Sequence, residues 1–159
     1  METNTIEIYT DGSCHVSSKL GTWGAILLYD AQELVLSGIV EQTTHNRMEL
    51  IAVLKAIEYL KAEKIEYQNL CVYSDSQYLV EIPRRKAKFL ENDFCNKAGK
   101  PLNNDDLLRE LVHIFEVENI QLIKVKAHQK KGEKINYNRK VDQLVRKLMR
   151  QHILENNLG

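Results

Sequence analysis

The chain has little of several residue types that would by themselves define a class of protein. Its 159 residues include three cysteines, two prolines and one tryptophan, and its charged side chains balance to a net charge of +0. Cys14, Cys71 and Cys95 are odd in number and far apart, with no CxxC pair among them. This spacing predicts reduced thiols of a cytoplasmic protein, without a disulfide framework or a zinc site.

The chain also lacks the long apolar segments of membrane and secreted proteins. No run of 18 apolar residues occurs, and the N-terminus has no basic region followed by an apolar one, so we predict neither a membrane span nor a secretory signal. No repeat or linker-like stretch divides the chain. Because 43% of the residues are hydrophobic, there is enough apolar material for one core. We therefore expect a single domain over residues 1–159 and a monomer.

The zero net charge conceals two halves of opposite sign. Residues 1–83 contain 5 Lys and Arg against 12 Asp and Glu, whereas residues 84–159 contain 17 against 10. The basic excess is strongest in residues 124–150, with 10 basic and 2 acidic side chains. A basic surface beside an acidic cluster suits an enzyme that binds a polyanion and acts on it through metal ions. A solvated helix surface is the commoner explanation for any single basic run.

Hydrophobic periodicity predicts an α/β fold. We expect strands at about residues 6–11, 21–29, 33–41, 70–73 and 120–126, and helices at about 46–63, 76–83, 105–117 and from 138 onward. A helix that begins near Ser76 should end or kink at Pro83, so residues 84–104 are predicted to be irregular. The order of elements predicts a mixed five-stranded sheet, of three antiparallel plus two parallel strands, flanked by helices.

Four carboxylates stand at the ends of these predicted elements. Each has an ordinary explanation: Asp11 could serve a turn, Asp75 could cap a helix, Glu49 could pair with Asn46 in a capping box, and Asp142 could favour the first turn of the last helix. The predicted topology nevertheless directs all four acids into one region, because Asp11 and Asp75 follow adjacent parallel strands.

Crowded carboxylates repel one another unless a cation lies between them. Oxygen ligands without a cysteine or a histidine pair select a hard cation, Mg²⁺ or Mn²⁺. The four acids together therefore predict a metal site.

Four spaced motifs, taken together, resemble ribonuclease H type 1 over nearly the whole chain. They are Tyr9-Thr10-Asp11-Gly12-Ser13, Asn46-Arg47-Met48-Glu49-Leu50, Ser74-Asp75-Ser76-Gln77-Tyr78, and Asn138 four residues before Asp142. The resemblance implies a ribonuclease H-like fold and an endonuclease that hydrolyses the RNA strand of RNA–DNA hybrids. It also implies that Asp11, Glu49, Asp75 and Asp142 bind two Mg²⁺ ions, with Mn²⁺ as the alternative.

The resemblance implies roles for further residues. His128, in Val125-Lys126-Ala127-His128, takes the place of a mobile histidine that moves protons, although an exposed loop residue is the ordinary interpretation of a lone histidine. The groups implied for contacts with the 2′-hydroxyls of the RNA strand are Gly12, Cys14, Thr44, Asn46 and Gln77. The lysine-rich loop at 127–137 and the basic segment 84–100 are implied to hold phosphates of the partner strand.

The sequence departs from the family pattern at several positions, and other functions remain open. The stretch after Ser13 is not rich in glycine and proline, His45 stands where asparagine is common, and segment 84–100 has no tryptophan. A non-catalytic nucleic-acid-binding module of the same fold is the main alternative. A transposase or resolvase of this fold would be expected to carry a different carboxylate arrangement and further DNA-binding domains.

Overall fold

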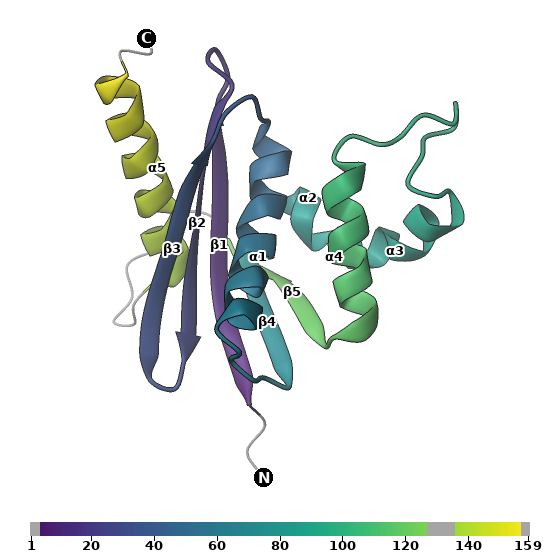
Figure 1. Cartoon of the computed structure of the whole chain (residues 1–159), viewed down its shortest axis with the longest axis horizontal. Coiled ribbons are helices and arrows are strands. Elements are labelled where there is room, and N and C mark those ends of the chain that lie inside the picture. Colours follow the sequence, from purple (N-terminus) through teal and green to yellow (C-terminus); the bar gives the residue numbers. More distant parts are fainter. Residues whose placement is uncertain (1–3, 127–135, 157–159) are drawn as a thin grey trace.

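A computed structural model of the chain describes residues 4–126 and 136–156. Five strands form one sheet in the order β3-β2-β1-β4-β5 (Figure 1). The strands are β1 (Thr5–His15), β2 (Leu20–Tyr29), β3 (Gln32–Val40), β4 (Asn69–Ser74) and β5 (Ile120–Lys124). Strands β1, β2 and β3 are antiparallel neighbours, whereas β4 runs parallel to both β1 and β5. The predicted mixed sheet is confirmed.

The central strand β1 is longer than the sequence pattern predicted. Asp11 was expected to end the strand, but β1 continues to His15 because this stretch pairs antiparallel with β2, from Asp11 opposite Gly24 to His15 opposite Leu20. The parallel pairing of β1 with β4 stops earlier, at Tyr9 opposite Tyr73. Asp11 therefore lies within a strand on its β2 side and beyond the last paired residue on its β4 side.

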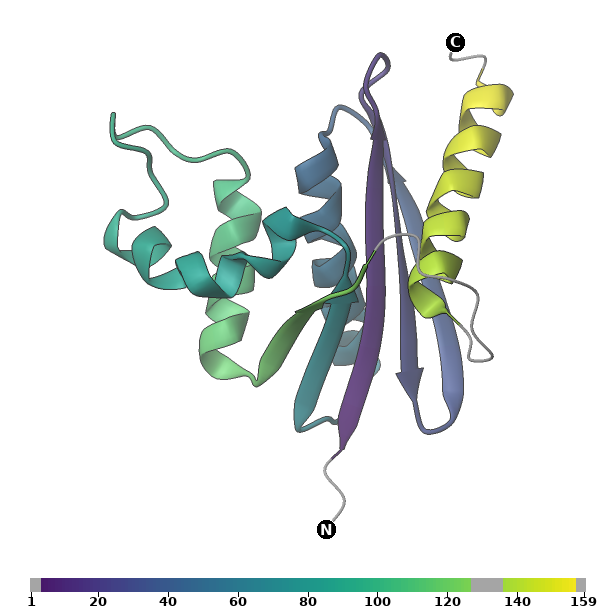
Figure 2. The same cartoon turned by 180° about the vertical axis from the view of Figure 1, so that it is seen from behind.

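The helices lie on both faces of the sheet. They are α1 (His45–Ala62), α2 (Gln77–Val80), α3 (Ile82–Glu91), α4 (Asp105–Val117) and α5 (Tyr137–Glu155). Helix α5 packs on one face, over β1 and β2, and α1 packs on the other face with α4 beside it (Figures 1 and 2). None of the described helices has the length and apolar character that crossing a bilayer requires.

The core lies between α1 and the sheet and extends to α4. Alternate residues of β1, such as Ile6 and Ile8, point toward α1 and are fully buried there. Leu50 and Ile57 come from the covered stripe of α1, and Leu111 of α4 closes the core on its far side. This packing fixes the position of α1 relative to β1, and so the position of any side chain at the start of α1.

The structure corrects the prediction for the segment after Pro83. Pro83 does not end a helix but stands in the first turn of α3, which continues to Glu91, so residues 84–91 are helical instead of irregular. The first turn of a helix tolerates proline because its N–H groups have no partner within the helix. A short helix therefore ends at Val80, and a new one begins at Ile82.

Candidate active site

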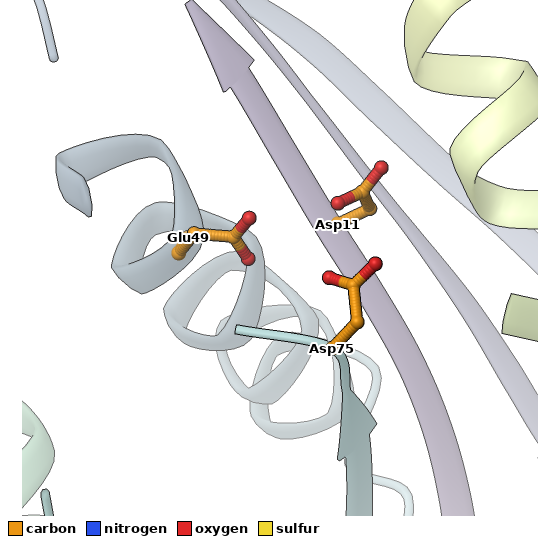
Figure 3. Close-up of side chains that lie close together, drawn as sticks. All are labelled: Asp11, Glu49 and Asp75. Atoms are coloured by element: carbon orange, nitrogen blue, oxygen red, sulfur yellow. The ribbon is translucent and has the colours of Figure 1, made fainter. Parts of the chain in front are cut away.

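Three of the four predicted acids form a compact cluster. Asp11 in β1, Glu49 in α1 and Asp75 just after β4 each offer a carboxylate oxygen, and these oxygens lie within 4.8 Å of one another (Figure 3). Asp11 is 7% exposed and Glu49 only 1%. Segments far apart in the sequence thus direct three acids into one small volume beside the central strands.

Gly12 allows the strand and the helix to approach closely enough to form this cluster. A Cβ atom at position 12 would lie 2.6 Å from the backbone carbon of Met48 and 2.7 Å from the backbone nitrogen of Glu49. Such distances are impossible for a real side chain, so the contact requires glycine. The backbone of Gly12 also hydrogen-bonds the carboxylates of Asp11 and Glu49, which offsets a small part of the rise in the pKa of each that burial causes.

Other residues make the helix caps that the acids could have made. Thr44 caps α1, because its hydroxyl accepts a hydrogen bond of 3.3 Å from the N–H of Arg47, so Glu49 is not part of a capping box with Asn46. Ser76 caps α2, because its hydroxyl accepts a hydrogen bond from the N–H of Leu79 at 3.2 Å. The capping explanations for Glu49 and Asp75 are therefore excluded.

The electrostatics of the cluster favour a bound cation. Burial, with the negative charges of Asp75 and Asp142, raises the pKa of Asp11 to about 8. Burial, with the charges of Asp11 and Asp75, raises the pKa of Glu49 to about 9. Oε2 of Glu49 is also buried and has no hydrogen-bond partner among residues 4–126 and 136–156. A divalent cation among these oxygens would reduce the repulsion between the carboxylates and would be coordinated by Oε2 of Glu49. The residues therefore fit a metal site.

Asp142 lies beside the cluster but not in the position predicted. Helix α5 begins at Tyr137, so Asp142 is in the second turn, and the first turn has no acidic residue. Its Oδ1 pairs with Nε of Arg146 at 3.2 Å. Asp142 is not one of the three acids whose oxygens lie within 4.8 Å of one another, but its charge adds to the effect of burial in raising the pKa of Asp11. The helix-dipole explanation for Asp142 is wrong, because the dipole acts within the first turn.

The structure describes all the other predicted site residues except His128, which lies outside the described residues. The thiol of Cys14 is a weak donor to the carbonyl of Thr43, with Sγ and O 3.4 Å apart. Asn46 is exposed in the first turn of α1. The side chain of Gln77 donates to Glu81 at 2.8 Å and accepts from Lys124.

Two features near the cluster were not predicted from the sequence. Nε2 of His45 lies 3.7 Å from Oε1 of Glu49, which the spacing of four helical residues could have suggested. A cavity of about 660 Å³ opens beside the start of α1, and its lining includes His45, Arg47, Arg85 and Asn104. Arg47 is held there by Asp106, with N–O distances of 2.9 and 2.7 Å. The residues that form this cavity come from distant segments, so no local pattern predicts it.

A mixed sheet of this order, with an oxygen-only acidic cluster beside its central strands, suits an enzyme that acts through divalent cations. The model of the RNase H family matches residues 3–150, and the chain belongs to this family. It is 38% identical to a Ribonuclease H of Caldanaerobacter subterraneus subsp. tengcongensis over 153 residues, 95% of each chain. It is 37% identical to a Ribonuclease H of Chlorobaculum parvum, over 89% of this chain and 93% of that protein.

A solved structure supports the assignment of the fold. The crystal structure of LC9-RNase H1, a type 1 RNase H with the type 2 active-site motif, superposes with a TM-score of 0.74. The match covers 91% of this chain and 71% of that one at 20% sequence identity. This likeness shows that the two chains share the ribonuclease H-like fold predicted from the sequence.

Proposed function

We propose that this protein is an endonuclease that cuts the RNA strand of RNA–DNA hybrids, with Asp11, Glu49, Asp75 and Asp142 as ligands of two Mg²⁺ ions. Its family consists of metal-dependent hydrolases that act on such hybrids. The observation that carries the assignment to this site is the cluster of three acids, two of them buried, in which one oxygen of Glu49 has no partner within the part of the chain that the structure describes. Mn²⁺ is the alternative ion, because it accepts the same oxygen ligands.

The side chains divide the work of holding the ions and the substrate. Asp11 shares the cluster with Glu49 and Asp75, and Asp142 also acts on its carboxylate, so Asp11 is the acid best suited to serve both ion positions. When bound, a pair of such ions activates the attacking water and stabilises the charge on the leaving 3′ oxygen. Because burial and the neighbouring charges raise the pKa values of Asp11 and Glu49, these two acids lose protons when they bind cations.

His128 completes the proposed catalytic group. A histidine has an ordinary pKa near neutrality, so it can take a proton from the attacking water or give one to the leaving oxygen. We assign this proton transfer to His128 on its position after β5.

Substrate contacts are proposed along the edge of the acidic cluster. Gly12, Cys14, Thr44, Asn46 and Gln77 are the proposed polar contacts to the 2′-hydroxyls of the RNA strand, across the shallow minor groove of the hybrid. Segment 84–100 and the lysine-rich loop at 127–137 are proposed to hold phosphates of the DNA strand. We also propose that residues 1–159 form a single domain, that the protein acts as a monomer and that it works in the cytoplasm.

A cleavage assay tests the proposed function. The protein is incubated with an RNA–DNA hybrid and Mg²⁺ or Mn²⁺, with double-stranded RNA and double-stranded DNA as substrate controls. Hybrid-specific cutting by the wild type is expected, with its loss in Glu49→Gln and its retention in Glu110→Gln, which removes an exposed carboxylate from α4. Binding of the hybrid without cutting would identify the chain as a nucleic-acid-binding module instead.

A further inference from the structure

Three tyrosines form an aromatic cluster next to the acidic site. The rings of Tyr9 in β1 and Tyr73 in β4 are stacked, with centroids 4.6 Å apart and an interplanar angle of 12°. The ring of Tyr137, the first residue of α5, lies against Tyr9 with centroids 5.3 Å apart. Stacked and tilted arrangements at these distances are the favourable ones for aromatic pairs.

Each of these tyrosines precedes one of the proposed catalytic acids. Tyr9 and Asp11 are two residues apart in β1, so their side chains point to the same face of the sheet. Tyr73 is followed two residues later by Asp75, at the end of β4. The stacked pair therefore joins the two parallel strands at their last paired residues, just before the strands separate to present their carboxylates.

Helix α5 reaches the same face through a stripe of residues four apart. Val141 and Val145 are fully buried, and they pack on β2 where Gly24 leaves room: a Cβ there would lie 3.3 and 3.0 Å from them. Gly24 is paired with Asp11, so this contact places α5 beside that acid. Tyr137 extends the stripe by one turn toward the start of the helix, where it meets Tyr9.

We propose that Tyr137 is a positioning residue, which packs the first turn of α5 on the Tyr9–Tyr73 pair and thereby keeps Asp142 beside Asp11. The inference rests on the proposed function, since it assigns Asp142 to the metal site. Asp142 is five residues after Tyr137, in the next turn of α5. A tilt of the start of the helix therefore moves the carboxylate of Asp142 relative to Asp11. Asn136 caps the helix, because its side-chain oxygen accepts a hydrogen bond of 3.0 Å from the N–H of Arg139. This contact is local and does not tie α5 to the sheet.

The first test needs no activity. Mn²⁺ is added to ¹⁵N-labelled protein, and its relaxation of the amide signals of residues 138–142 is measured. We expect this relaxation to fall in Tyr137→Ala and to remain in Tyr137→Phe, which keeps the ring. Tyr67→Ala is the matched control, because Tyr67 is also half-buried but lies away from α5 and hydrogen-bonds Glu118 at 2.6 Å. Unchanged relaxation in Tyr137→Ala, or an equal loss in Tyr67→Ala, would overturn the proposal.

The second test is kinetic. Tyr137→Ala should lower kcat for hybrid cleavage by roughly tenfold and raise the Mg²⁺ concentration needed for half-maximal rate, because small misplacements of a catalytic group are costly. The KM for the hybrid should stay the same, and Tyr137→Phe should restore kcat. An effect on KM alone would contradict a positioning role. A wild type that cuts no hybrid would refute the proposed function, while the relaxation experiment would still decide whether Tyr137 positions Asp142.

Discussion

Replacing Asp11 by asparagine should abolish hybrid cleavage and yet make the metal-free protein more stable at neutral pH. Asparagine keeps the shape of the side chain but removes the ionisable group, whose pKa is raised to about 8 in the folded protein by burial and two other carboxylates. A carboxyl group whose pKa is higher in the folded state stabilises the fold when it is protonated. That stability is fully present below the unfolded pKa and is lost as the pH rises through the folded pKa.

The size of the effect follows from the two pKa values. From the ordinary pKa of 3.8 up to pH 7 there are about three pH units. Over this range Asp11 is ionised in the unfolded state but stays protonated in the folded state, so the free energy of unfolding falls by about 1.4 kcal/mol per pH unit. About 4 kcal/mol is therefore the upper bound on this basis. The side-chain amide of the Asp11→Asn variant would still be buried without full hydrogen bonding, so a gain on the order of 2 kcal/mol is expected. For a chain of this length the melting temperature should rise by about 4–8 °C.

Thermal unfolding in EDTA, followed by circular dichroism at pH 7.5 and at pH 3.5, measures this difference. The gap between Asp11→Asn and the wild type should nearly close at pH 3.5, where Asp11 is largely protonated in both the folded and the unfolded state. Saturating Mg²⁺ should reverse the order, because the wild type gains about 2.7 kcal/mol at a concentration of 100 Kd and the variant gains much less. A metal-free variant that is less stable than the wild type at pH 7.5, or one that cuts hybrid normally, would refute the electrostatic account.

Three further substitutions test other parts of the structure. Gly12→Ala should destabilise the protein by about 1–3 kcal/mol in urea unfolding, because the new Cβ would meet the backbone of α1 at 2.6 Å, and an unchanged midpoint would contradict the close approach. Leu111→Ala, at a fully buried position of α4, should cost about 2–5 kcal/mol in the same assay without changing the Mg²⁺ requirement. His128→Ala should lower kcat and remove a limb near neutrality from the pH–rate profile while leaving the melting temperature unchanged, and an unaltered profile would exclude proton transfer by this residue.

The sequence was sufficient to predict the sheet because its strands carry strong local patterns. The alternation of Ile6 and Ile8 predicts β1, and the short apolar run that ends at Tyr73 predicts β4. These two strands are neighbours in the middle of the sheet. The parallel pairing of these strands follows from the helix between them. This pairing alone brings Asp11 and Asp75 together, so these two acids of the site could be predicted from the sequence.

The errors arose where tertiary contacts override local signals. Asp11 and Gly12 look like a strand end followed by a turn, but pairing with β2 carries the strand on to His15. Pro83 looks like a helix stop, yet it begins a second helix. The pair of His45 with Glu49, in contrast, lies within α1 and has the spacing of four residues that brings side chains together on a helix, so the sequence could have suggested it.

The stability cost of the site explains why its supports are so rigid. Three acids that repel one another would move apart in the metal-free protein if their elements could shift, and Asp11 and Glu49 would then recover their ordinary pKa values. Gly12 prevents this between β1 and α1, because the two backbones are already in contact there and the buried core behind α1 holds them together. Holding the acids in this geometry lowers the free energy of unfolding of the metal-free protein. A bound cation removes the repulsion, so it stabilises the folded state and binds more tightly. Asp142 is carried by α5, which is held on the sheet through side chains: Val141 and Val145 pack at Gly24, and the hydroxyl of Thr22 donates to the carbonyl of Val145 at 3.1 Å. Substitutions in that packing should therefore loosen the site at Asp142 before they affect Asp11, Glu49 or Asp75.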